Sequence, residues 1–167
     1  MTLTAHGTVG AVVVAVMPTN PVLGLGLAFG SHFILDLIPH YDYRILSLDH
    51  EAEKGGVVKM TFSKNFIFDL GRIGLDAVVG LAIAMGIVYF FELSNFTLLI
   101  LGGAILGMLP DFLQFVNGKV NNYFLSSLQK FHNFFHTKHK LVGWPVVGFI
   151  SQTTFVLLIV LLFFLSQ

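Results

Sequence analysis

The chain has no cysteine and few charged residues. Without thiols it forms no disulfide and no thiolate metal site. Charged residues make up 11% of its 167 residues and hydrophobic residues 55%, whereas soluble domains carry about 25% charged residues. The formal net charge is zero, so no overall field attracts nucleic acid. These deficits exclude an ordinary soluble domain and predict an integral membrane protein with one domain, residues 1–167.

The uncharged stretches are long enough to suggest membrane helices. Residues 141–167 carry no charge, and neither do 93–110 or 77–91. A helix needs about 20 apolar residues to cross a bilayer core. Glu92 and the polar residues after it separate the last two stretches, which predicts an antiparallel helical hairpin.

The first apolar stretch, residues 7–35, is interrupted by Pro18 and Pro21. Proline and asparagine here favour a turn, so we expect two helices, about 3–17 and 21–38. The alternative is one kinked helix over 7–38, which would place His6 on the opposite face of the membrane. No basic segment precedes the first stretch, so we expect a permanent helix and not a cleaved signal.

The expected fold is an all-α integral membrane protein. It is a bundle of about five transmembrane helices plus a short interfacial helix, with spans at about 3–17, 21–38, 64–91, 95–117 and 143–165. All nine Lys and Arg residues lie in two stretches, 44–72 and 119–140, and this topology puts both on one side. The positive-inside rule then assigns the loops 39–63 and 118–142 to the cytoplasmic face, with the cell (inner) membrane as the expected location.

Histidine and aspartate recur where these expected helices meet the charged side. His32 and Asp36 are four residues apart, so they share a helix face, and His40 and Asp42 follow Pro39. Imidazole and carboxylate together suit Zn, Fe, Mn or Ni. The alternative is a buried His–Asp pair that only holds helices together. Ionisable groups in membrane helices are costly, which favours a functional role.

Three charged residues share one stripe of the third expected helix. Asp69 and Arg72 can pair near the interface. Asp76 lies about 10 Å deeper than Asp69 by helical rise, and we expect it to be a ligand or the partner of one. Asp111 follows Pro110 at the charged end of the fourth helix. It is a candidate ligand, with an interfacial carboxylate in water as the alternative.

The segment 131–139 is the richest local cluster. His132 and His136 have the i, i+4 spacing by which a helix presents two ligands to one metal, with Phe residues around them. The alternative is an amphipathic helix whose His and Lys meet lipid head groups. His6 opens the first expected helix and is a weak candidate alone. His50 and His139 are expected to be solvated.

Four motifs give the chain a resemblance to a known family. They are Ala5-His6-Gly7, Ser31-His32-Phe33-Ile34-Leu35-Asp36, Leu109-Pro110-Asp111 and His132-Asn133-Phe134-Phe135-His136. With these four motifs together, the chain resembles the YdjM-like family of membrane-bound metal-dependent hydrolases. That family continues Pro-Asp with Ile-Asp-His, where this chain has Phe112-Leu113-Gln114, and it orders the motifs differently. His40 and Asp42 are the residues that would replace the missing pair. The resemblance implies a reaction class and no substrate.

The leading hypothesis is a metal-dependent hydrolase at the cytoplasmic membrane surface. It would hold one or two divalent ions, with Zn²⁺ expected, and Asp42 or Asp76 would act as general base or support a ligand. Its location favours a phosphoester or lipid head group as substrate, and no nucleic acid partner is expected. The expected metal ligands are His6, His32, Asp36, His40, Asp111, His132 and His136.

Two other function classes stay open. A non-enzymatic scaffold or adaptor would dock a soluble partner through 39–63 and 119–140, with purely structural His and Asp residues. A metal or proton transporter is disfavoured because Glu92 is the one ionisable residue in the opposite half of the bundle, so relay groups are lacking.

Overall fold

The computed structural model describes residues 1–49, 59–120, 122–136, 141 and 144–165. Over these residues the regular secondary structure is helical, apart from one isolated bridge between Leu48 and Met60. Its elements are α1 (Leu3–Val16), α2 (Pro21–Asp36), α4 (Phe66–Phe90), the short 3₁₀ helix η1 (Ser94–Phe96), α5 (Thr97–Asn117), α6 (Tyr123–Phe135) and α7 (Pro145–Leu165).

Three segments are long and apolar enough to cross a membrane: α4, η1 with α5, and α7. The other two apolar helices are shorter, 14 residues in α1 and 16 in α2. At 1.5 Å per residue α1 is about 21 Å long, less than the roughly 30 Å of a bilayer core. These helices indicate a membrane protein. Of the five spanning helices expected, three are long enough to cross a bilayer among the described residues.

The chain breaks between α1 and α2 as the two prolines predict. α1 ends at Val16 and α2 begins at Pro21, where proline fits the first helical turn. The Asn20 side chain accepts a hydrogen bond from the Leu23 amide at 3.3 Å, which satisfies one free donor of the new helix. Two helices with a tight turn replace the single kinked helix, so His6 lies on the same side as the other histidines.

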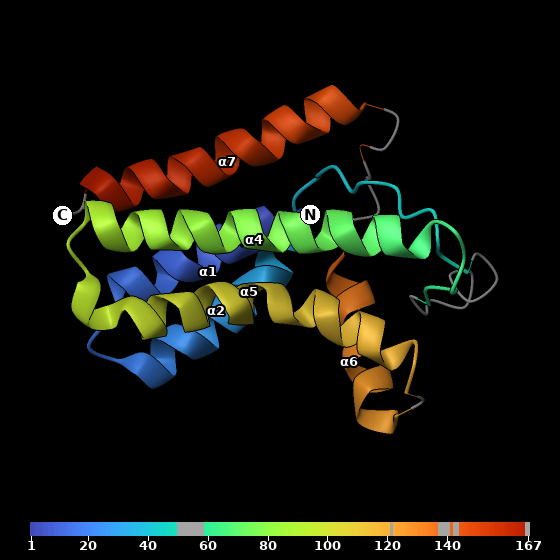
Figure 1. Cartoon of the computed structure of the whole chain (residues 1–167). Helices are drawn as coiled ribbons and strands as arrows, with labels where there is room; N and C mark the ends of the chain where they lie inside the picture. The colour runs from blue at the N-terminus through green and yellow to red at the C-terminus, as the bar shows by residue number, and fades with distance from the viewer. Residues whose placement is uncertain (50–58, 121, 137–140, 142–143, 166–167) are drawn as a thin grey trace.

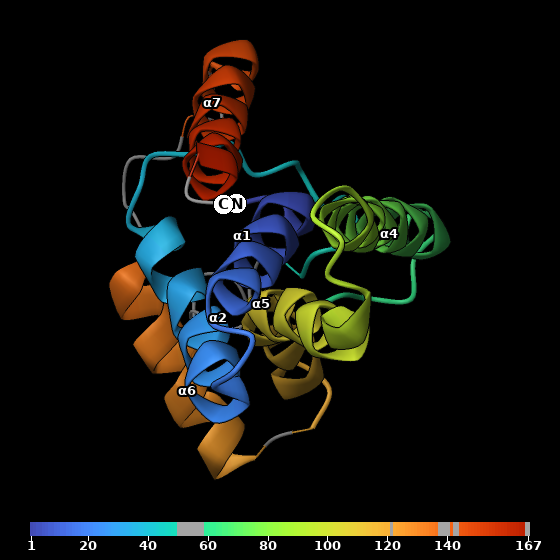
Figure 2. The ribbon, with the colours of Figure 1, turned by 90° about the vertical axis from the view of Figure 1, so that its left-hand side faces the viewer.

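α1 is the central helix and packs against α2, α4, α5 and α7 (Figure 2). Glycine allows its backbone to approach α5 closely. A Cβ at Gly10 would collide with the carbonyl oxygen of Gly103, and one at Gly107 with that of His6. Such contacts between small residues are typical of membrane helix pairs. They place His6 directly against the turn of α5 that contains Gly107.

The connections divide between two ends of the molecule (Figure 1). The turns at 17–20 and 91–96 and the last turn of α7 lie at one end, here called the turn end. Residues 37–49 and 59–65 and helix α6 lie at the other, here called the polar end. α6 runs crosswise to α4 and α5 (Figures 1 and 2), as an interfacial helix would.

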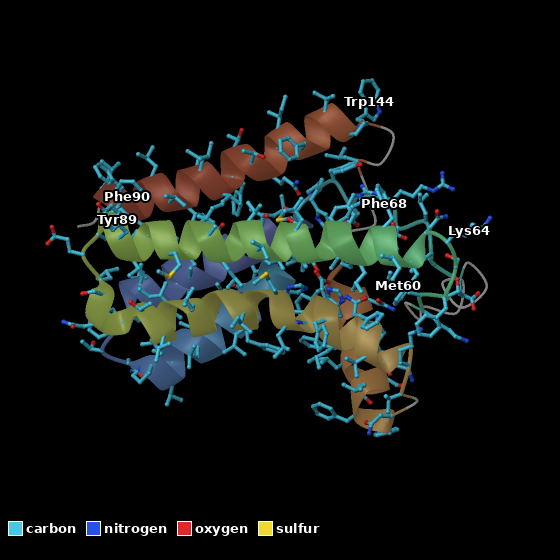
Figure 3. All side chains as sticks on the ribbon, viewed as in Figure 1. Met60, Lys64, Phe68, Tyr89, Phe90 and Trp144 are labelled. Carbon is cyan, nitrogen blue, oxygen red and sulfur yellow. The ribbon has the colours of Figure 1, made fainter. Side chains whose placement is uncertain are left out.

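Exposed aromatic side chains mark both ends. Figure 3 shows Trp144 and Phe68 toward the polar end and Tyr89 and Phe90 at the turn end, and all four are solvent-exposed in the isolated chain. Tryptophan and tyrosine concentrate at the two membrane–water interfaces. The separation of Phe68 from Tyr89 and Phe90 along α4 therefore fits a helix that crosses a bilayer.

Candidate metal centre

Eight histidine and aspartate side chains gather near the polar end, and we call them the histidine–aspartate cluster. α1 and α2 deliver three of them, the segment after α2 two, α5 one, and the end of α6 two. Several are completely buried, which is unusual for such polar groups. The members of the cluster are His6, His32, Asp36, His40, Asp42, Asp111, His132 and His136.

Asp36 lies at the middle of the cluster. Its Oδ2 atom is 2.6 Å from His132 Nε2 and 3.2 Å from His32 Nε2. Its Oδ1 atom is 3.3 Å from His6 Nε2. One buried carboxylate thus meets imidazoles from three different helices. His6 is 30 and His132 is 96 positions away from it in the sequence, and His32 is one helical turn away.

Three groups of ligand atoms have the spacing that a metal ion needs. They are His6–His32–Asp36, His32–Asp111–His132 and Asp36–His40–His136, and within each group the atoms lie within 4.8 Å of one another. These buried His and Asp groups could hold a metal ion. His32 and Asp36 each belong to two groups, so the three are parts of one connected site.

Backbone carbonyls set the orientation of two histidines. His32 Nδ1 lies 2.8 Å from the Gly107 oxygen, and His40 Nδ1 lies 2.7 Å from the Ile38 oxygen. A carbonyl accepts only, so Nδ1 of each ring carries the proton and donates it. In a neutral ring Nε2 then presents a lone pair to the neighbouring carboxylates. Metal-binding histidines use this same arrangement, in which the second nitrogen donates to a carbonyl.

Buried nitrogen atoms in the cluster lack good hydrogen bonds. Over the described residues, neither ring nitrogen of His6 nor Nε2 of His40 makes one. The His6 ring stacks on His32, with centroids 3.9 Å apart. Buried polar atoms without partners cost free energy, and a shared cation would satisfy these nitrogens and the carboxylates together. The donor set therefore fits a divalent ion.

Asp42 and His136 form the more open side of the cluster. Asp42 Oδ1 is 3.1 Å from His40 Nε2, and its Oδ2 is 3.8 Å from His136 Nε2. Burial raises the pKa of the Asp42 carboxyl, but the nearby His40 imidazole and the Met1 amino group outweigh burial, so this pKa is lowered. Asp42 is thus ionised at neutral pH and can bind a cation.

The His132 and His136 rings lie close together at the end of α6, with centroids 5.6 Å apart. His132 is buried against Asp36 and His32. His136 ends α6 with an extended backbone, and its ring lies 5.0 Å from that of His40. The two imidazoles belong to different ligand groups, and both approach Asp36. The prediction that they share one ion stays a prediction.

Asp76 lies beside α1 and belongs to none of the three ligand groups. Its carboxylate accepts hydrogen bonds from the Leu3 amide at 2.7 Å, the Thr4 amide at 3.0 Å and the Thr4 hydroxyl at 2.6 Å. It therefore joins α4 to the first turn of α1, where free amides and the helix dipole favour negative charge. Asp76 supports the helix that carries His6.

The spacing of Asp69 and Arg72 suggests that they pair with each other, but each contacts a different group. The buried Asp69 accepts a hydrogen bond from the Ser47 amide at 2.7 Å. Arg72 Nη1 donates to the Arg44 carbonyl oxygen at 3.3 Å. Both residues thereby fix the segment that follows Asp42 against α4. His50 and His139, expected to be solvated, lie outside the described residues.

Two glutamines support the cluster and were not predicted from the sequence. Gln114 Nε2 contacts His132 Nδ1 and lies 3.1 Å from Asp111 Oδ1. Gln129 Nε2 donates to Gln114 Oε1 at 2.8 Å. Each glutamine lies three residues from a cluster member on the same helix, at a spacing that shares a helix face. That spacing is the one signal that could have identified them.

No protein-family model, no curated protein and no solved structure matches this chain. The geometry of the cluster is therefore the basis for any functional assignment.

Proposed function

We propose that the protein is a membrane-bound metal-dependent hydrolase with its centre at the cytoplasmic interface. The supporting observation is the buried carboxylate of Asp36 among three imidazoles, with the His32 proton fixed on the nitrogen that faces away. A structural His–Asp pair needs one donor and one acceptor. Three imidazoles around one carboxylate exceed that need, whereas a cation uses all of them.

The divided ligand groups favour two ions. One ion would bind His32, Asp111 and His132, and a second would bind His40 and His136. Asp36, which lies between the two groups, and His6, which lies against its Oδ1 atom, would be further ligands. Imidazole and carboxylate ligands suit Zn²⁺.

The reaction class follows from what such a centre does and where it lies. A divalent ion lowers the pKa of a coordinated water to about 7 and polarises a phosphoryl oxygen. Asp42, ionised beside His40, would accept the proton of the attacking water. A phosphoester or lipid head group fits a centre at head-group depth. The resemblance to the YdjM-like hydrolases points to the same class. Asp76 has no step here, because its oxygens are engaged by α1.

The test is the metal content and activity of purified protein. Wild-type protein in detergent should retain Zn²⁺ or another divalent ion, measured by inductively coupled plasma mass spectrometry, and should hydrolyse a chromogenic phosphodiester. Asp36→Asn keeps the side-chain shape but removes the charge, so metal content should fall at least tenfold, as expected for loss of a ligand. Glu92→Gln removes a carboxylate at the turn end and should change neither.

A wild-type protein that binds no divalent ion even after Zn²⁺ titration would contradict the proposal. Unchanged thermal stability of Asp36→Asn together with unchanged metal content would do the same. Either result would favour a scaffold whose His and Asp residues are structural.

A further inference from the structure

A shallow pocket lies next to the histidine–aspartate cluster. Its volume is about 310 Å³, and its walls come from the start of α1, the segment after Asp42, and α4. Tyr43, which follows Asp42 directly, forms one wall. Tyr43 therefore connects a wall of the pocket to Asp42, a member of the cluster.

Three members of the cluster are more exposed than the rest. Most of its side chains are at most 2% exposed, but those of Asp111, Asp42 and His136 are 30%, 27% and 19% exposed. Asp42 precedes Tyr43 in the chain, so one of these exposed groups adjoins a wall of the pocket.

The pocket is lined by one cation, Arg72, and one carboxylate, Asp76. Asp76 lines it, but three hydrogen bonds from α1 engage its carboxylate. Arg72 also lines it, with its guanidinium 5.2 Å from the centre of the Tyr43 ring. Over the described residues, Arg72 uses its Nη1 group for the Arg44 carbonyl. A guanidinium has five N–H donors, so the remaining ones can bind a phosphate, for which arginine has matching geometry.

On the same α4 side of the pocket, beside Arg72, lie two apolar side chains that are exposed in the isolated chain. Leu75 and Val79 lie one helical turn apart on α4, and they are 66% and 42% exposed in the isolated chain. α4 is long and apolar enough to span the membrane. From Arg72 to Val79 the helix rises about 10 Å. The pocket thus joins a cation at its polar side to an alkyl-binding wall that continues into the bilayer.

We propose that this pocket binds the phosphate group of a membrane lipid, with Arg72 on the phosphate and the lipid chain along Leu75 and Val79. The inference rests on the proposed hydrolase, because it names a lipid-linked phosphoester as the substrate class. Tyr43 and Arg72 then position the head group beside Asp42 and Asp111. Neither residue is needed to hold metal.

The test measures binding and not turnover. Protein in phosphatidylcholine nanodiscs is titrated with phosphatidic acid that carries a fluorescent chain. Arg72→Gln should weaken binding about tenfold, the effect of losing a charge-assisted contact worth roughly 1.4 kcal/mol. Arg72→Lys should recover part of it, because the charge stays but the two-pronged geometry is lost. Lys64→Gln, an exposed cation before the same helix, should bind like wild type.

Competition distinguishes the two sources of phosphate. Unlabelled phosphatidic acid should displace the probe, and glycerol phosphate at equal concentration should not. Displacement by glycerol phosphate as effectively as by the lipid would overturn the lipid part of the proposal. Equal affinity of wild type and Arg72→Gln would overturn the pocket itself.

The failure of the pocket and the failure of the hydrolase are distinguishable. Asp36→Asn should still bind phosphatidic acid, because Asp36 does not line the pocket. Arg72-dependent binding in a protein without metal would support the pocket and reject the hydrolase. Normal metal content and phosphodiester hydrolysis with Arg72-independent lipid binding would support the hydrolase and reject the pocket.

Discussion

Gln114 connects two proposed metal ligands that come from different helices. Its amide contacts both His132 on α6 and Asp111 on its own helix α5. Removing such an orienting contact lowers metal affinity by about 10- to 100-fold in other metalloproteins. Gln114→Leu keeps the apolar volume, so we expect a Zn²⁺ affinity loss in that range with a similar melting temperature. Competition with a fluorescent zinc chelator measures it.

The matched control for Gln114→Leu is on the same helix at the turn end. Thr97→Val removes a hydroxyl that donates to Ser94 and should leave zinc affinity unchanged. Wild-type affinity in Gln114→Leu would show that the amide does not orient His132 for an ion.

Single residues were predictable where their chemistry is unusual for their position. His32, Asp36 and Asp111 stand out in the sequence because apolar residues surround them, and the structure brings them together. Gln114 and Gln129 carry no such signal, because an uncharged amide near a helix end is ordinary. The contact of His32 with the Gly107 carbonyl was beyond prediction, since it depends on how closely α1, α2 and α5 pack.

At the scale of helices, glycines allow α1 and α5 to pack closely, and this packing positions His6 and His32 in the cluster. In Gly107→Ala the new methyl group would collide with the His6 carbonyl oxygen, and that same turn of α5 accepts the His32 hydrogen bond. We expect a loss of about 1–3 kcal/mol in unfolding free energy, as for other overpacked contacts. Reversible unfolding in detergent measures it, and zinc affinity should fall with it.

Gly26→Ala provides the control for Gly107→Ala. Nothing lies within 4 Å of a Cβ at Gly26 on α2. Alanine has a higher helix propensity than glycine by about 1 kcal/mol, so this variant should be as stable as wild type or more so. Equal stability of Gly107→Ala and wild type would mean that α1 and α5 separate at little cost.

Helix positions were predictable from composition, but helix roles were not. Pro18 and Pro21 predict the α1–α2 break because proline cannot continue a helix. The spacing of His132 and His136 predicts one shared face, and their rings lie 5.6 Å apart at the end of α6. Asp76 was expected to be a metal ligand or the partner of one, because it lies deeper along its helix than Asp69. It faces the amides at the start of α1, and no sequence pattern indicates that α1 begins at this level.

At the scale of the whole molecule, the two ends should face opposite sides of the membrane. The chain lacks cysteine, so one introduced thiol reports its own location. Ser63→Cys lies at the polar end and Asn95→Cys at the turn end, and both positions are exposed. If the polar end is cytoplasmic, a membrane-impermeant maleimide should label Asn95→Cys in intact cells and Ser63→Cys only after permeabilisation.

Two outcomes of the labelling matter for the topology. The reverse pattern would invert the orientation and place the cluster on the outer side. Labelling of both thiols in intact cells would mean that the polar and turn ends share a side, which is incompatible with membrane-spanning α4 and α5.

The crosswise position of α6 has a consequence for the assembly of the protein during synthesis. Gln129 and His132 are the buried residues of this helix, so polar groups provide much of its attachment to α5 and α2. The ribosome releases α6 only after α1, α2, α4 and α5 have been made. A nascent chain that ends before Tyr123 therefore has the carboxylates of Asp36 and Asp111 but no His132 to meet them. Docking of α6 closes the cluster, and an ion captured at that step would couple cofactor loading to maturation of the chain.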